Sequence, residues 1–158
     1  MRETFSVTFA PNDALRIAPR GEMTEPVFRV LPTLDEPSAF FWTSGADGKL
    51  RFLRCSECAC LIHPPAPICP KCHCRDATPT EVSGRGTVHS FTVNHQAWDG
   101  AGDVYVIGLV EIEEQPDVRL TTNIIETDPD AVRIGMPVEV VFEDHSPVFV
   151  PLFRPVAP

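Results

Sequence analysis

From Val82 onward, the chain alternates between apolar and polar residues in short runs that are separated by turn residues. Such alternation is typical of strands that bury one face. The runs predict five strands, at residues 87–95, 104–112, 119–125, 138–142 and 148–153. Between the third and fourth strands, Asp128-Pro129 can cap and begin a single helical turn. This order predicts a five-stranded OB-fold barrel over residues 82–158, with a small sandwich as the alternative.

The chain before the barrel has shorter patterns. Residues 1–31 alternate only from Phe5 to Phe9 and are interrupted by prolines, so an extended N-terminal arm is expected. Residues 32–48 predict a short helix with Asp35 as its N-cap and glycines at its end. A helix of about three turns is unstable alone, so its aromatic side chains must pack against something.

Those aromatic residues are Phe40, Phe41 and Trp42. Three consecutive residues point in three directions around a helix, so at least one of them is expected to point outward. Outward aromatic side chains are common at protein interfaces. The sequence therefore leaves two interpretations open, packing within the chain and a partner interface.

All six cysteines lie between positions 55 and 74, in two similar phrases that each contain a Cys-x-x-Cys motif. Strand-like runs precede the motifs, at residues 49–54 and 61–65. A Cys-x-x-Cys turn directs two sulfurs to one point, and two such turns supply four thiolates to one tetrahedral metal ion. Residues 49–81 are therefore predicted to form a zinc ribbon.

The predicted metal ligands are Cys55, Cys58, Cys69 and Cys72, because their equal spacing makes the two motifs equivalent. A closed four-thiolate site leaves no position for water or substrate, so a structural Zn²⁺ is expected rather than a catalytic one. Iron is the alternative metal, because the same spacing binds it. The alternative ligands are Cys60, His63, His73 and Cys74.

Composition supports a mainly β protein. The 158 residues include 17 prolines, about twice the usual share, which favours short strands and turns over long helices. No apolar run approaches the roughly 20 residues that cross a bilayer, and the opening residues do not resemble a signal peptide. A cytoplasmic protein without a membrane partner is expected. In that reducing compartment, clustered cysteines are metal ligands rather than a disulfide scaffold.

Two other groups of residues suggest chemistry. His89 and His95 precede Asp99 and Asp103, and a histidine beside a carboxylate can act as a general base. The simpler interpretation is that these are solvent-facing strand and loop residues, because no nucleophile motif accompanies them. The run from Ser83 to Gly86 could bind a phosphate through its amides, although a turn before a strand is the commoner role.

The net charge of −9 is unevenly distributed, because residues 82–158 contain four arginines against twelve acidic residues. A ribbon joined to a barrel is frequent in nucleic-acid-binding proteins, but these need a positive groove with stacking aromatic side chains. An acidic barrel with a single tyrosine disfavours that class, so no nucleic-acid partner is expected. Basic residues that could form a small patch are Lys49, Arg51, Arg54 and Arg85.

Several phrases of the sequence together resemble a known family. They are Phe41-Trp42, Arg54-Cys55-x-x-Cys58, Ile62-His63-Pro64-Pro65, Cys69-Pro70-x-Cys72, Val82 to Val88 and Arg133 to Val138. The family consists of acyl-CoA-associated proteins in which a rubredoxin-like zinc ribbon is joined to an OB-fold, long known as a domain of unknown function. The similarity runs from about Pro32 to Pro155. The chain departs from the family at Ala59 and His73, where glycine is frequent, and in the additional Cys60 and Cys74.

The resemblance implies a non-catalytic accessory subunit that docks on a thiolase-superfamily enzyme, forms a heterotetramer with it and helps to shape its acyl-CoA site. The chain is most similar to partners of the thiolase-like aldolases of steroid side-chain degradation, which cleave a β-hydroxyacyl-CoA with catalytic residues of their own. A CoA thioester is then expected in the partner's site, with its phosphates contacted by Lys49, Arg51, Arg54 and Arg85. The alternatives are a partner acting on another acyl-CoA and a nucleic-acid-binding ribbon and barrel.

Overall fold

The computed structural model describes residues 16–17, 23–24, 30–96 and 104–156. The chain divides into two compact units, Met1–Val30 and Leu31–Pro158. In the first unit, β1 (Arg16–Ile17) pairs antiparallel with β2 (Met23–Thr24). The remainder of the predicted arm, including the alternating run from Phe5 to Phe9, lies outside the described residues.

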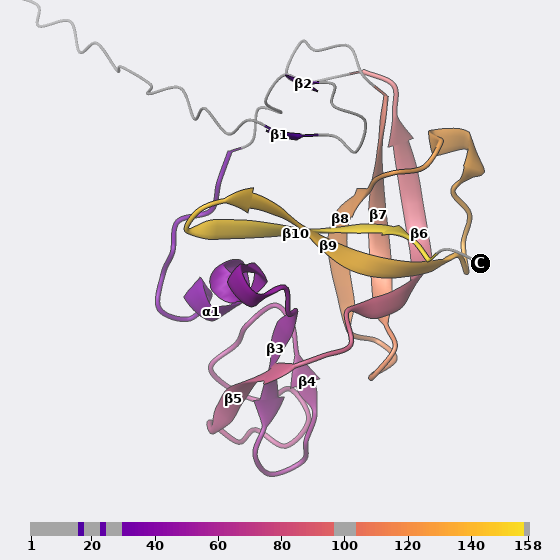
Figure 1. The fold of residues 1–158 in the computed structure, drawn as a ribbon. Helices are drawn as coiled ribbons and strands as arrows, with labels where there is room; N and C mark the ends of the chain where they lie inside the picture. Colours follow the sequence, from indigo (N-terminus) through magenta and orange to yellow (C-terminus); the bar gives the residue numbers. More distant parts are fainter. Residues whose placement is uncertain (1–15, 18–22, 25–29, 97–103, 157–158) are drawn as a thin grey trace, which may run out of the picture. The chain divides into compact units, whose positions relative to one another are not determined.

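The second unit contains the predicted five-stranded barrel (Figure 1). Its strands are β6 (Arg85–Asn94), β7 (Tyr105–Ile112), β8 (Arg119–Ile124), β9 (Pro137–His145) and β10 (Val148–Pro155). They close in the order β6-β7-β8-β10-β9, and every neighbouring pair is antiparallel except β8 and β10. One turn of 3₁₀ helix, η2 (Pro129–Ala131), lies between β8 and β9, and the Asp128 side chain caps it as predicted. The closed order confirms the barrel over the sandwich.

The side chains of the barrel strands alternate between interior and surface. In β7 every second residue is buried, including Val106 and Val110. In β6 the pattern changes between Val88 and Ser90, where the pairing register shifts at a β-bulge. The bulge explains why inward-facing Val88 and Phe91 are three positions apart rather than two.

The ribbon is a three-stranded sheet in the order β4-β3-β5, formed by β3 (Arg51–Cys55), β4 (Leu61–Ile62) and β5 (Ala77–Glu81). The sequence predicts the first two strands, although β4 is shorter than expected, and misses β5. Strand β5 has no apolar alternation and contains Pro79. Proline lacks a backbone N–H, and it is tolerated there because β5 is an edge strand, where the outward side of the backbone pairs with no other strand.

The helix α1 (Ala39–Thr43) continues into one turn of 3₁₀ helix, η1 (Ser44–Asp47), and Gly48 ends it with a φ of 74°. The prediction of Asp35 as its N-cap is wrong, because the N-cap is Ser38. Asp35 instead caps the preceding turn by accepting a hydrogen bond from the Ser38 amide at 3.2 Å. The physical reason is local bonding: the Ser38 and Ala39 amides both donate to the Asp35 carbonyl and close a separate turn before the helix.

Helix, ribbon and barrel share one hydrophobic core. Phe41 of the helix, Phe52 and Leu61 of the ribbon and Phe153 of the barrel belong to the same cluster of buried side chains. A second, smaller cluster surrounds the cysteines. Across the described part of the chain, no helix has the length and hydrophobicity needed to cross a membrane.

Candidate metal centre and its surroundings

The four predicted ligands converge on one point of the ribbon. The sulfurs of Cys55, Cys58, Cys69 and Cys72 all lie within 4.8 Å of one another. The shortest distances join the two motifs, at 3.4 Å between Cys55 and Cys72 and 3.5 Å between Cys58 and Cys69. Tetrahedral zinc with Zn–S bonds of about 2.3 Å separates its sulfurs by about 3.8 Å, so the set fits that ion closely.

The two Cys-x-x-Cys turns are conformational copies. The Ala59 amide donates to the Cys55 carbonyl and the His73 amide to the Cys69 carbonyl, both at 3.0 Å. Ala59 and His73 occupy the same left-handed conformation, with φ of 57° and 60°. Glycine enters this region most readily, so a glycine at either position would fit the turn without strain. The two turns of this chain keep the left-handed conformation without glycine.

The environment of the sulfurs favours a bound cation. The pKa of the Cys69 thiol is lowered to about 6, chiefly because the Cys72 amide donates a hydrogen bond to its sulfur. The Cys74 amide lowers the pKa of Cys72, but the sulfurs of Cys55, Cys58 and Cys69 together raise it to about 12. One thiolate is thus stabilised by amides, whereas four thiolates at such distances require a positive ion among them.

The alternative ligands lie outside this set among the described residues. The Cys60 sulfur is buried and lies 3.6 Å from the Gln115 side-chain nitrogen. The Cys74 sulfur accepts a hydrogen bond from the Asp76 amide at 3.3 Å. His63 packs between two aromatic rings, with centroids 4.9 Å from Phe41 and 4.6 Å from Phe52. Burial lowers the pKa of His63 to about 4, so its imidazole is neutral at pH 7.

The helix aromatics are placed mainly inside the chain. Phe41 is 2% exposed and packs edge-to-face on Trp42 and parallel to Phe52. The expectation that Phe41 contacts a partner is therefore not supported, because no surface remains for it. Phe40 and Trp42 are half-buried against the same core, and for these two a partner contact stays a prediction.

The four basic residues fall into two groups. Lys49 donates to Glu81 at 2.7 Å, and Arg51 forms a two-point contact with Asp47 at 2.5 and 2.9 Å. Arg54 is half-buried and Arg85 exposed, and neither forms an ion pair with another described residue. Lys49 and Arg51 are thus already neutralised, whereas the charges of Arg54 and Arg85 are available to a ligand.

The run from Ser83 to Gly86 is a structural turn. The Ser83 amide donates to the Glu114 carboxylate, and the Arg85 amide donates to the Ser83 hydroxyl at 3.1 Å. A side chain at Gly84 would overlap Val140, and Gly84 has a φ of 72°. The Ser83 and Arg85 amides are already occupied, and the glycine at position 84 is explained by close packing.

The proposed general-base residues do not form a described catalytic group. His89 is exposed and lies 3.9 Å from Glu111, whose carboxylate also accepts from Arg119 at 3.1 Å. His95 is exposed after the end of β6, and Asp99 and Asp103 lie outside the described residues. Nothing in the described part joins His89 or His95 to a nucleophile in a cleft.

Two polar contacts escape sequence analysis. Gln115, in the turn after β7, accepts from the Leu61 amide at 2.8 Å and so ties the barrel to the ribbon. Glu143 and His145 of β9 form a buried pair at 2.8 Å, with side chains 3% and 8% exposed. Their alternate spacing in a strand is the one sequence signal that they share a face, and it does not reveal which face is buried.

Family models match both domains. Residues 42–76 match the model described as the ChsH2 rubredoxin-like zinc ribbon domain, and residues 79–143 match the ChsH2 C-terminal OB-fold domain. A DUF35 domain-containing scaffold protein of Methanothermobacter thermautotrophicus is 36% identical over 92 residues, which cover 56% of this chain and 68% of the relative.

Two longer relatives are also similar. A probable enoyl-CoA hydratase alpha subunit of Thermomonospora curvata is 36% identical over 150 residues, covering 91% of this chain and 46% of the relative. The 3-oxo-4,17-pregnadiene-20-carboxyl-CoA hydratase alpha subunit of Mycobacterium tuberculosis is 36% identical over 121 residues, covering 76% of this chain and 38% of the relative. This chain therefore spans less than half the length of these two proteins.

A solved structure described as the Ltp2-ChsH2(DUF35) aldolase contains a similar chain. The TM-score is 0.72 at 35% identity, and the match covers 80% of this chain and all of the other. Both domain models agree with the four-sulfur ribbon and the closed barrel. The chain belongs to the DUF35 family, with a zinc ribbon and an OB-fold of the ChsH2 type.

Proposed function

We propose that this protein is a non-catalytic accessory subunit that binds and stabilises a thiolase-superfamily enzyme acting on acyl-CoA. The observation that carries the proposal is its similarity over 80% of its length to a chain of the Ltp2-ChsH2(DUF35) aldolase. In this role the ribbon and barrel form a rigid surface, and the catalytic residues belong to the partner. A heterotetramer is the proposed assembly.

The metal centre supports a structural role. Four thiolates fill the coordination sphere of zinc, so no position is left for a water or a substrate oxygen. The ion would be held by Cys55, Cys58, Cys69 and Cys72 and would supply the cross-link that holds the two turns together. Among the described residues, the exposed His89 lies near the Glu111 carboxylate but is not joined to a nucleophile, so it does not form a catalytic group.

The proposed reaction of the complex is retro-aldol cleavage of a β-hydroxyacyl-CoA. The bond between the α- and β-carbons breaks, the β-hydroxyl becomes a carbonyl as it loses its proton, and the α-carbon gains a proton to give a shorter acyl-CoA. The name of the Mycobacterium tuberculosis relative supports a steroid side chain as the acyl group. Another acyl-CoA is the alternative substrate.

We place the CoA phosphates of the partner's substrate near Arg54 and Arg85. The charges of Lys49 and Arg51 are engaged by Glu81 and Asp47, which leaves Arg54 and Arg85 as the stronger candidates of the predicted set. Arg85→Ala is expected to raise the KM for acyl-CoA about fivefold while the complex still forms. Arg133→Ala, which removes an exposed arginine elsewhere on the barrel, is the matched control and should leave KM unchanged.

The central experiment is co-expression with the thiolase-superfamily subunit of the same organism. A tag on this chain should copurify that subunit, and cleavage of a β-hydroxyacyl-CoA should require both chains. Absence of copurification, together with unchanged solubility and activity of the partner, would refute the proposal. Turnover by this chain alone would identify it as an enzyme instead.

A further inference from the structure

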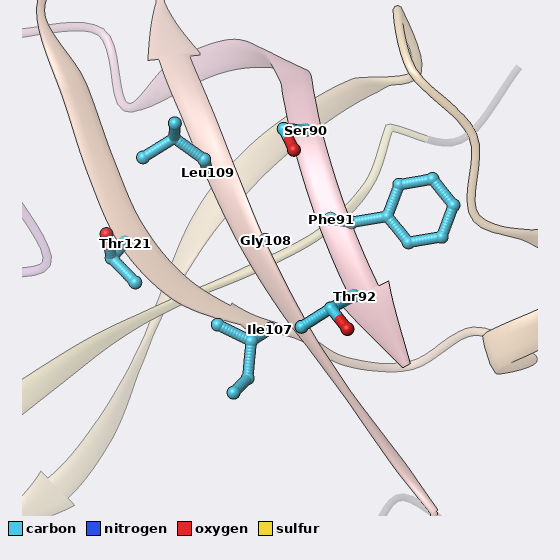
Figure 2. Close-up of a pocket in the computed structure, with 7 residues that line it drawn as sticks. All are labelled: Ser90, Phe91, Thr92, Ile107, Gly108, Leu109 and Thr121. Carbon is cyan, nitrogen blue, oxygen red and sulfur yellow. The ribbon is translucent and has the colours of Figure 1, made fainter. Parts of the chain in front are cut away.

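The outer face of the barrel sheet carries an ordered pattern of uncharged side chains. Cross-strand pairing across β6, β7 and β8 places Ser90, Leu109 and Thr121 in one row. The next row contains Thr92, Ile107 and Asn123. Figure 2 shows Leu109 and Ile107 on either side of Gly108, with Thr121 on one neighbouring strand and Ser90 and Thr92 on the other. We call these two rows the β6–β8 face.

Aliphatic side chains form the centre of the β6–β8 face, and hydroxyl and amide groups form its flanks. Ile107 and Leu109 are half-buried, whereas their neighbours Val106 and Val110 are fully buried in the barrel. The rows enclose a shallow depression with a volume of about 170 Å³. Small-molecule pockets are usually about 300 Å³ or larger and enclose their ligand, so this surface fits a flat contact better.

Charged residues lie at both ends of the β6–β8 face. At one end, Glu111 and Arg119 form the next row, and the turn beyond it contains Glu113, Glu114 and Asp117. At the other end, Glu126 follows β8, and its carboxylate is paired with Arg154 at 3.2 Å. Glu111 is neutralised by Arg119 at 3.1 Å, whereas Glu113 and Glu114 are exposed acids. The face thus has an uncharged centre, exposed acids at one end and a neutralised carboxylate at the other.

This pattern narrows the class of partner. Strand addition to the barrel is excluded, because a closed barrel has no free strand edge. Oligonucleotides bind the equivalent face of OB-folds through cations and stacking aromatic rings. The two rows contain neither, and Arg119, the nearest described cation, is engaged by Glu111. A protein surface is the remaining fit.

We propose that the β6–β8 face docks a protein surface with an aliphatic centre and with lysine or arginine opposite Glu113 and Glu114 at one end. Such a surface would complete the burial of Ile107 and Leu109, pair with the flanking hydroxyls and complement the acidic end. The identity of the partner, the thiolase-superfamily subunit, rests on the proposed function. The placement also agrees with the burial of Phe41, which removes part of the contact surface expected on the helix.

The test measures the affinity of this chain for the purified thiolase-superfamily subunit by titration calorimetry. Leu109→Arg places a charge in the centre of the face and is expected to weaken binding at least about tenfold. Thr121→Arg, at an exposed position of the same row, should do the same without touching the core. Ile134→Arg makes a matched change at a residue that is 71% exposed outside the face, and it should bind like the wild type.

The outcomes separate the face from the proposed function. Metal content and the thermal midpoint establish that each variant is folded. If Leu109→Arg is unfolded, the affinity of Thr121→Arg alone tests the face. If both face variants bind like the wild type, the β6–β8 face is not the docking surface, and the proposed complex is unaffected. If the wild type does not bind the subunit, both proposals fail. Binding of a labelled single-stranded oligonucleotide that Leu109→Glu abolishes would overturn the protein-docking face in favour of a nucleic acid.

Discussion

At the scale of single residues, the metal centre depends on which cysteines point inward. Cys55 and Cys69, the first cysteines of the two motifs, are buried, and Cys58 and Cys72, the second, are exposed. Equivalent backbone hydrogen bonds hold both motifs in this arrangement. Cys60 and Cys74 occupy equivalent positions after the motifs, yet their sulfurs interact with Gln115 and with the Asp76 amide instead.

Serine substitution of the six cysteines should therefore divide them into two classes. Cys72→Ser removes a ligand, and we expect the protein to lose most of its bound metal, because three thiolates bind zinc far more weakly than four. Cys60→Ser and Cys74→Ser should retain one metal ion per chain. Elemental analysis of the purified variants measures this and distinguishes zinc from iron. Full metal content in Cys72→Ser would disprove its assignment as a ligand.

The left-handed residues give a second prediction at this scale. Ala59→Gly and His73→Gly should each raise the free energy of unfolding by about 0.5–1 kcal/mol, because glycine relieves the strain of a positive φ. Chemical denaturation with zinc present measures the change. Ala46→Gly, an exposed position in η1 without a positive φ, is the matched control and should be destabilised by a similar amount. Equal effects at all three positions would contradict the explanation.

At the scale of elements, the helix is fixed by aromatic contacts to the ribbon on one side and by close packing on β9 and β10 on the other. His63 lies between Phe41 and Phe52, and its Nδ1 is buried without a hydrogen-bond partner. On the other side, the backbone of Gly45 lies so close to Phe142 and Phe149 that a Cβ atom would overlap both.

The burial of His63 predicts a loss of stability in acid. Its pKa is about 4 in the folded protein against an ordinary 6.5, so the unfolded chain takes up a proton first as the pH falls. Between pH 7 and pH 5 this costs about 2 kcal/mol. His63→Phe keeps an aromatic ring in the stack and should remove this part of the pH dependence. The measurement is the free energy of unfolding of both proteins at each pH, with zinc in excess. Parallel curves would show that His63 does not titrate in this way.

The close approach at Gly45 predicts a steric effect. Gly45→Ala should lower the free energy of unfolding by about 2 kcal/mol, because the methyl group forces η1 away from β9 and β10. Gly48→Ala is the control, because its Cβ would meet no atom within 4 Å and only the positive φ opposes it. We expect about half the effect there. A larger loss at Gly48 than at Gly45 would mean that backbone conformation, not packing, dominates.

At the scale of the whole molecule, two hydrophobic clusters are stabilised in different ways. The larger one joins helix, ribbon and barrel, and the closed sheet encloses much of it. The smaller one contains Cys55, Cys60, Ile62 and Cys69 and depends on the cross-link between the two Cys-x-x-Cys turns. Loss of the metal should therefore loosen the second cluster before the first.

Limited proteolysis tests this order. After removal of the metal with a chelator, trypsin should cleave at the exposed Lys71 and Arg75 about tenfold faster, because this end of the ribbon opens locally. Cleavage after Arg119, which belongs to strand β8 of the closed barrel, should remain slow. Mass spectrometry identifies the fragments. Equal acceleration at Lys71 and Arg119 would show that ribbon and barrel unfold as one cooperative unit.

The sequence by itself determined the parts of this protein that depend on local spacing. Two equal Cys-x-x-Cys intervals place four sulfurs around one point, and period-two alternation gives the barrel strands. The Asp128 cap is also a local feature. These predictions are confirmed because neighbouring residues alone set the geometry that they describe.

Only the tertiary structure decided the features that join distant residues. Strand β5 forms because its backbone pairs with β3, and Phe41 is buried because Phe52 and the barrel cover it. Lys49 is neutralised by Glu81, far along the chain, and Glu143 and His145 form a pair inside the protein. Burial and pairing of this kind depend on which surfaces meet during folding, and one sequence pattern is compatible with several such arrangements.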